Sequence, residues 1–257
     1  MQKEIIKNRK GKNIIVVIEE TKDQKGLAFV MHGLGGFKEQ PNVLSMAKPF
    51  TDNNFTVVRF DTTNSTGESG GKLEDATISN YFQDLEDVIK WAQSQNWYQE
   101  PFWLSGHSLG GFSVAFFAIN YPEKVKAVVP VSAVVSGKLF IQTEEMKKVL
   151  ESWKETGLRE WESSSQPGLI KRLKYDFIED CLKYDLLKDV HQIKCPVLLV
   201  VGDRDETTPS EHQKIFFDSL NTKKEIQIIK NLKHTPKEKC HLEKLESIIG
   251  EWIKKNK

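Results

Sequence analysis

The stretch Gly106-His107-Ser108-Leu109-Gly110 places a serine at the centre of a G-x-S-x-G pattern. An apolar run at 101–104 precedes it and a helix-prone run at 111–119 follows it, which gives the strand, turn and helix that the pattern requires. At such a turn the central residue is strained, and glycines two positions away on either side avoid a clash. We therefore expect the Ser108 hydroxyl to be exposed at the end of a strand, where it could attack an acyl carbon.

Two further groups are needed for this chemistry, because a base must take the serine proton and a carboxylate must orient the base. His234 lies a few residues after the last predicted strand, and Asp203 and Asp205 directly follow the predicted strand at 197–201. Ligands of parallel sheets bind at the carboxyl ends of the strands, so these side chains are placed to meet Ser108. Without them, the five-residue pattern fits a turn with a capping serine equally well.

A glycine-rich stretch, His32-Gly33-Leu34-Gly35-Gly36, follows an apolar run at 27–31. Glycines at these positions allow the backbone to approach a substrate closely. The alternative is an ordinary turn. A phosphate-binding loop is disfavoured, because neither the P-loop pattern nor the dinucleotide pattern is present here.

The elements that must position these residues alternate between strand and helix. The segments 5–6 and 14–18 flank a turn at 8–11 and predict an antiparallel hairpin. Later strands are predicted at 27–31, 55–60, 101–104, 125–131, 197–201 and 224–229, and helices at about 41–52, 85–92, 111–119, 211–220 and 242–253. This alternation predicts an α/β fold with a mostly parallel central sheet and helices on both faces.

The segment 132–194 interrupts the alternation, because it is charged and helix-prone. We interpret it as an inserted helical cap on a core formed by 1–131 and 195–257, with a break at 163–168. The alternative is a longer helical connection within one core.

Aromatic side chains are scattered through this cap. Trp153, Trp161 and Tyr175 are candidates for substrate contact. The competing interpretation is that they form the hydrophobic core of the cap itself.

Composition narrows the function further. The 257 residues suit one α/β domain with an insertion, and 37 basic against 36 acidic residues leave a net charge of +1. This balance gives no reason to expect a nucleic acid or membrane partner. The N-terminal stretch lacks a long apolar region, so we expect no signal peptide. The three cysteines are widely spaced, which argues against a disulfide framework or structural zinc and favours a cytoplasmic protein.

The motifs together resemble those of the α/β-hydrolases, whose triad follows the chain order serine, acid, histidine. More narrowly, the chain resembles small microbial esterases related to feruloyl (cinnamoyl) esterases and monoacylglycerol lipases. The matching stretches are H-G-L-G-G at 32–36, D-T-T-N-S-T-G-E-S-G-G at 61–71, G-H-S-L-G-G at 106–111, C-P-V-L-L-V-V-G-D-R-D-E-T-T-P at 195–209, and His234. One departure is Thr63-Asn64-Ser65, where such esterases often have G-H-G. Because that loop borders the pocket in the family, the resemblance is a better guide to the chemistry of this chain than to its substrate preference.

The resemblance implies that Ser108 is the nucleophile, His234 the base and Asp205 the acid. Asp203 is the alternative acid and is expected to brace the turn instead. His241 is a rival base, but it falls in the final predicted helix.

The resemblance also implies an oxyanion hole formed by the backbone amides of Leu34 and Leu109. We therefore expect a serine hydrolase that forms an acyl-enzyme on a small ester, with a short acyl chain or an aryl (hydroxycinnamate-like) group. It needs no cofactor, and no metal site is predicted. An amidase, peptidase or thioesterase with the same triad remains open, and so does the oligomeric state. A non-catalytic binding protein is disfavoured because all three triad residues are present, and a dehalogenase because its nucleophile would be aspartate.

Overall fold

The computed structural model describes residues 1–163 and 168–256. Within these residues, eight strands form a central sheet in the order β1-β2-β4-β3-β5-β6-β9-β10. β1 and β2 form the predicted antiparallel hairpin, β2 also runs antiparallel to β4, and the other neighbours are parallel. The strands are β1 (Gln2–Lys7), β2 (Asn13–Glu19), β3 (Gly26–Met31), β4 (Phe55–Asp61), β5 (Phe102–His107), β6 (Val125–Val131), β9 (Val197–Gly202) and β10 (Lys224–Ile229). The predicted, mostly parallel sheet is confirmed.

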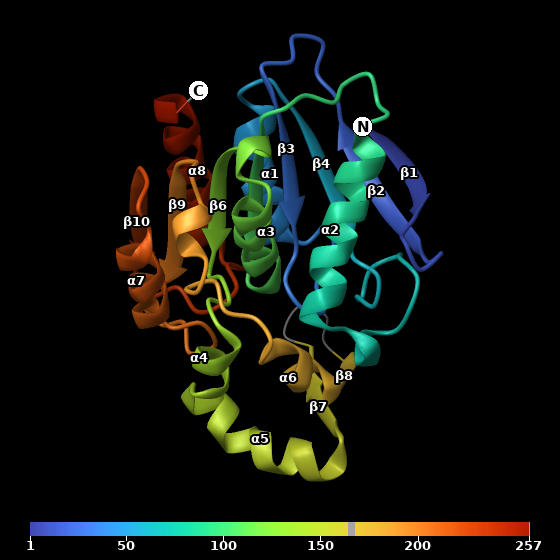
Figure 1. Ribbon diagram of the computed structural model, residues 1–257, viewed down its shortest axis with the longest axis vertical. Coiled ribbons are helices and arrows are strands. Elements are labelled where there is room, and N and C mark those ends of the chain that lie inside the picture. The colour runs from blue at the N-terminus through green and yellow to red at the C-terminus, as the bar shows by residue number, and fades with distance from the viewer. Residues whose placement is uncertain (164–167, 257) are drawn as a thin grey trace.

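Helices cover both faces of this sheet, as the alternation predicted (Figure 1). α2 (Ile78–Ala92), α3 (Leu109–Asn120) and α7 (Ser210–Ser219) contribute to the core on one face, and α1 (Pro41–Thr51) and α8 (Lys239–Asn256) to the core on the other.

The central strands are mostly apolar because both of their faces are covered. In β3, Phe29 belongs to the core under α2 and α3, whereas its neighbours Ala28 and Val30 belong to the core under α1 and α8. The helices follow local signals: Thr77 caps α2 by accepting a hydrogen bond from the Asn80 amide. Short 3₁₀ turns lie at Leu73–Asp75, Pro122–Lys124 and Val190–Gln192.

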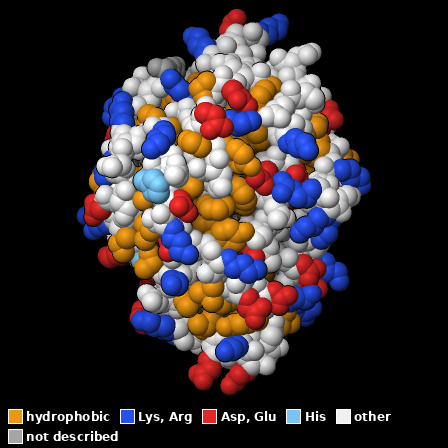
Figure 2. Space-filling model, in the orientation of Figure 1, with side chains coloured by type: hydrophobic (Ala, Val, Ile, Leu, Met, Phe, Trp, Pro, Cys, Tyr) orange, Lys and Arg blue, Asp and Glu red, His pale blue; other side chains and the backbone are white. Residues whose placement is uncertain are grey.

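The cap lies beyond the carboxyl ends of the parallel strands. In Figure 1 the arrows of β3, β6 and β9 point toward it. It consists of α4 (Gly137–Ile141), α5 (Glu144–Thr156), the strands β7 (Leu158–Glu162) and β8 (Ile170–Lys174), and α6 (Asp176–Cys181). On the face in Figure 2, positive and negative side chains are interspersed, in line with the balanced net charge. The division of the chain at 132–194 remains our proposal.

The prediction of a helical cap missed the antiparallel ribbon of β7 and β8. Both strands alternate between exposed and more buried side chains, but each is only five residues long and rich in charge, so its period of two is weak in the sequence. Gly157, with φ of 71°, ends α5 directly before the ribbon. Part of the predicted break at 163–168 lies outside the described residues, which omit 164–167.

Among the described helices, none combines the length and apolar character needed to cross a membrane.

Candidate active site

Ser108 occupies the turn between β5 and α3, as the G-x-S-x-G pattern predicted. Its backbone has φ of 55° and ψ of −113°, a strained conformation for a residue with a side chain. The flanking glycines are required by close packing. A Cβ atom at Gly106 would lie 2.4 Å from the Gly110 carbonyl oxygen, and one at Gly110 would lie 2.5 Å from the His32 carbonyl oxygen. Tight packing on both sides therefore holds the Ser108 hydroxyl at the end of β5.

Ser108, His234 and Asp205 lie together at the carboxyl ends of β5, β10 and β9. The Ser108 Oγ is 2.9 Å from His234 Nε2, and His234 Nδ1 is 3.0 Å from Asp205 Oδ2. The aspartate is buried, and the histidine side chain is 22% exposed. Ser108 was expected to be exposed at the end of its strand, but it is only 7% exposed, because it lies in a cavity that residues of the cap also line. This chain of hydrogen bonds can pass the serine proton to a histidine whose other ring nitrogen faces a carboxylate.

Asp205 is held rigidly by its own loop. Its Oδ1 accepts hydrogen bonds from the amides of Thr207 and Thr208, at 3.0 and 2.8 Å. Burial raises the pKa of the Asp205 carboxyl, but the charge of His234, its hydrogen bond and the Thr208 amide together hold that pKa below its usual value. Asp203, the alternative acid, is exposed. Only Asp205 of the two is hydrogen-bonded to His234 among the described contacts.

His107 positions the loop that carries His234, which the sequence did not reveal. Its Nε2 lies 2.8 Å from the His234 carbonyl oxygen, and the two ring centroids are 4.9 Å apart. Burial, and the nearby His234, lower the pKa of His107 to about 3. The ring is therefore neutral and donates its Nε2 proton to the carbonyl. His107, at the variable second position of the G-x-S-x-G motif, thus links the turn that carries Ser108 to the loop that carries His234.

Two buried side chains, those of His32 and Tyr81, hold the glycine-rich stretch 33–36 in place. His32 Nδ1 donates to the Gly33 carbonyl at 2.7 Å while its Nε2 accepts from the Thr62 amide at 3.0 Å. The Tyr81 hydroxyl donates to the same Gly33 carbonyl and accepts from the Gly35 amide. His32 therefore shapes this loop, and Tyr81 was missed because it comes from α2.

The two amides expected to form the oxyanion hole flank Ser108. Leu34 lies in the loop held by His32 and Tyr81, and Leu109 is the first residue of α3. Both residues line the cavity that contains Ser108 and His234. In the described part of the chain, neither amide donates to a backbone carbonyl. Each is therefore available to a substrate oxygen, and their role stays a proposal.

A cavity of about 680 Å³ lies between these loops and the cap. Trp153 and Trp161, two of the three aromatic candidates, line it, whereas Tyr175 is not among its lining residues. Trp153 is buried, and its indole donates to the Leu173 carbonyl at 3.0 Å. Trp161 lies beneath the guanidinium of Arg159, 5.3 Å from the ring centroid. Trp153 thus combines a cap-core role with a place in the cavity wall, and Tyr175 packs within the cap.

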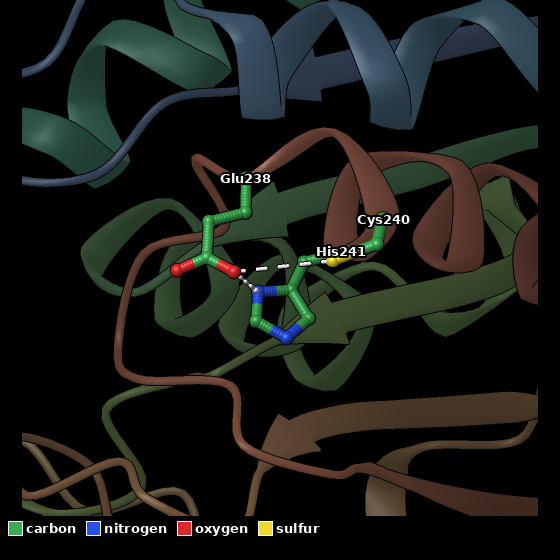
Figure 3. Close-up of side chains that lie close together, drawn as sticks. All are labelled: Glu238, Cys240 and His241. Carbon is green, nitrogen blue, oxygen red and sulfur yellow. Dashed lines mark hydrogen bonds and ion pairs between the residues drawn. The ribbon is translucent and has the colours of Figure 1, made fainter.

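His241, the rival base, also lines the cavity but faces other groups (Figure 3). Its Nδ1 is 3.8 Å from Glu238 Oε2, and Cys240 lies beside the same carboxylate, 3.9 Å away. The ligand atoms of these three side chains lie within 4.8 Å of one another. No metal site was predicted from the sequence, and this group of potential ligands was missed. Glu238 and Cys240 are exposed, and among the described residues no further histidine, cysteine or carboxylate is grouped with these three.

A family model described as serine aminopeptidase, S33 (Hydrolase_4) matches residues 22–172. The mitochondrial palmitoyl-protein thioesterase ABHD10 of Bos taurus is 30% identical over 202 residues, which are 77% of this chain and 63% of that protein. A pyrethroid hydrolase of Sphingobium wenxiniae is 32% identical over 76 residues, or 30% of this chain and 25% of that protein. The match to ABHD10 thus spans less than two thirds of that protein's length.

Solved structures share the fold at lower identity. Est1E from Butyrivibrio proteoclasticus, with ferulic acid bound, has a TM-score of 0.81 and 20% identity, and the match covers 98% of each chain. Mouse alpha/beta hydrolase domain-containing protein 10 has a TM-score of 0.79 and 22% identity over 99% of each chain. The predicted α/β-hydrolase fold, and the resemblance to microbial esterases, are confirmed.

Proposed function

Because the chain belongs to the serine aminopeptidase S33 family, we propose that it is a serine hydrolase that cleaves carboxylic esters through an acyl-enzyme intermediate. One observation carries the proposal: Ser108, His234 and Asp205 form a continuous chain of hydrogen bonds at the wall of a cavity. The matched family region ends at residue 172, so the assignment of the acid and the base rests on this geometry.

In the proposed first half-reaction, His234 Nε2 takes the proton of Ser108 as Oγ attacks the ester carbonyl carbon. The carbonyl oxygen becomes an oxyanion, which the amides of Leu34 and Leu109 stabilise. As the intermediate collapses, the ester bond breaks and His234 gives its proton to the departing alcohol. The acyl group is then bonded to Ser108.

In the second half-reaction, a water molecule attacks the acyl carbon and gives a proton to His234. Collapse of this intermediate releases the carboxylic acid and returns the proton to Ser108. Asp205 fixes the tautomer of His234 with the proton on Nδ1, and it stabilises the imidazolium that forms in each half. The low pKa of Asp205 suits this role, because an ionised carboxylate faces the developing positive charge.

The composition of the cavity wall is one reason to propose that the substrates are small esters, with a short acyl chain or an aryl group. Its wall combines aromatic side chains of the cap with polar and charged groups. A thioester is the second candidate, favoured by the likeness to the palmitoyl-protein thioesterase of Bos taurus. A panel of 4-nitrophenyl esters of increasing chain length, hydroxycinnamate esters and acyl thioesters with the same acyl groups would separate the two by their kcat/KM values.

The decisive experiment is labelling with a fluorophosphonate, which reacts with activated serines. We expect Ser108→Ala to abolish labelling and to lower kcat about a million-fold while the protein stays folded. Ser113→Ala is the matched control, because Ser113 is buried one turn later in α3 and bonds only the Leu109 carbonyl in the described structure. Near-wild-type turnover in a folded Ser108→Ala protein would refute the proposal.

We propose a cytoplasmic location from the cysteine usage. Cys181, Cys195 and Cys240 are free, and two of them are buried. The relative from Bos taurus is described as mitochondrial, so fractionation of the native cell with detection of the protein is the test.

A further inference from the structure

Lys171 brings a positive charge from the cap into the catalytic cavity. It lies in β8, it is only 7% exposed, and it lines the cavity. Its Nζ donates to the Gly35 carbonyl at 2.7 Å. Gly35 directly follows Leu34, the residue proposed to supply one amide of the oxyanion hole. The ammonium group therefore lies next to the loop that would hold the scissile carbonyl.

This ammonium group lacks an acidic partner among the described residues. An ammonium has three N–H donors, and the described contacts account for one, to the Gly35 carbonyl. A buried charge without a counter-ion is unfavourable. Burial, reinforced by the charge of Lys237, accordingly lowers the pKa of Lys171. An anion in the cavity would relieve this cost.

The surrounding charges favour an anion as well. Among the described residues, five cationic side chains line the cavity, namely Arg159, Lys171, Arg204, Lys233 and Lys237. The acidic side chains in its lining are Glu145 and Glu238. Glu145 already bonds Arg159 at 3.1 Å and the Thr207 hydroxyl at 2.8 Å. The lining therefore carries an excess of positive charge, although the whole chain is nearly neutral.

We propose that Lys171 binds a carboxylate on the substrate, so that the preferred substrates are esters that carry a negative charge near the scissile bond. Lys237 and Lys233 add to the positive potential at this subsite. The inference rests on the proposed esterase function and narrows its substrate class. The carboxylate belongs either to the acyl part or to the alcohol part of the ester, and each source is tested separately.

Two pairs of esters isolate the charge. For the acyl side, mono-4-nitrophenyl glutarate is compared with 4-nitrophenyl hexanoate, and for the alcohol side, 4-acetoxybenzoate is compared with 4-acetoxybenzamide. The measured quantity is the ratio of kcat/KM for the anionic ester to that for the neutral ester, at constant ionic strength because salt screens charges. We expect the wild type to favour the anionic ester of at least one pair.

Lys171→Met should lower this ratio about 10- to 100-fold, the range of a hydrogen bond to a charged group, because the anionic ester loses more kcat/KM than the neutral ester does. Lys171→Arg should keep most of the preference. Lys174→Met is the matched control on the same strand, because Lys174 is exposed, pairs with Asp75 and does not line the cavity. It should leave the ratio unchanged.

Two results would overturn the inference. One is a wild-type enzyme that hydrolyses neutral esters without preferring either anionic ester, which would leave the proposed function standing. The other is an equal loss on anionic and neutral esters in Lys171→Met, which would assign Lys171 to bracing the Gly35 loop. If Lys171→Met does not fold, Lys171→Gln, whose neutral amide can still donate to the Gly35 carbonyl, gives the same decision. A wild type that hydrolyses no ester refutes the function and the inference together.

Discussion

Replacing Asp205 with asparagine separates the role of its charge from that of its shape. Asp205 Oδ1 accepts the amides of Thr207 and Thr208, so the asparagine carbonyl oxygen must take this place. The NH2 group then occupies the position of Oδ2, 3.0 Å from His234 Nδ1. An NH2 group donates, so it favours Nδ1 as an acceptor, while the carbonyl oxygen at the Oδ1 position, 3.1 Å from Nδ1, is already occupied by the two backbone amides. The neutral ring would therefore carry its proton on Nε2, the nitrogen that faces Ser108.

The size of the effect follows from this tautomer. With a proton already on Nε2, His234 cannot accept the serine proton across the 2.9 Å hydrogen bond. The equivalent change in a serine protease lowers kcat about 10⁴-fold, which corresponds to about 5 kcal/mol of activation free energy. We expect Asp205→Asn to lose about four orders of magnitude in kcat on 4-nitrophenyl butyrate. Its melting temperature should fall only modestly, because the side chain keeps its shape and its two backbone hydrogen bonds.

Asp203→Asn is the matched control, since Asp203 is exposed two residues earlier in the same loop. It should retain wild-type kcat within a few-fold, as surface substitutions usually do. If Asp205→Asn retained activity within tenfold of the wild type, the tautomer argument would be wrong. If Asp203→Asn instead lost the activity, Asp203 would be the acid and the loop would be aligned wrongly by two residues.

Two further predictions concern pH and the cap. Hydrogen bonds from Lys3 and Lys38 lower the pKa of Glu68 to about 2, so the wild type should be more stable than Glu68→Gln above about pH 4.5, and this difference in melting temperature should vanish as the pH falls toward 2. A difference that grows in acid would contradict this sign. Trp153→Ala should lower the free energy of unfolding by about 3–5 kcal/mol, because the ring is buried and bonded, whereas Trp161→Ala should mainly raise KM. Chemical denaturation measures the free energy of unfolding of each variant, and steady-state kinetics measure its KM. If the two variants were destabilised equally, the proposal that Trp161 contacts the substrate would be weakened.

The three catalytic candidates could be predicted from the sequence because each lies in or near a short motif. Ser108 was predictable because a strand, a sharp turn and a helix leave a local pattern of glycines. Asp205 and His234 were predictable because a parallel sheet brings the ends of its strands to one edge. Their mutual hydrogen bonds could not be predicted, since they join positions 126 and 29 residues apart in the chain.

The side chains that support the site were missed for a related reason. Tyr81 reaches the glycine-rich loop from α2, and Lys171 reaches Gly35 across 136 residues. Neither contact leaves a periodic signal in the sequence. The β7–β8 ribbon was missed because charged residues on two short strands resemble an exposed helix. The cap was therefore the part of the fold that sequence patterns described least well.

This division between sheet and cap has a consequence for specificity. The groups proposed for the chemistry lie on segments that follow β3, β5, β9 and β10, where hydrogen bonds within and between the loops hold them. The cavity wall opposite comes from the cap, and Lys171 extends from it to the Gly35 carbonyl. Substitutions in the cap can thus change the charge that a substrate meets without moving Ser108 or His234. Under our proposal, the charge at Lys171 sets which esters this chain prefers.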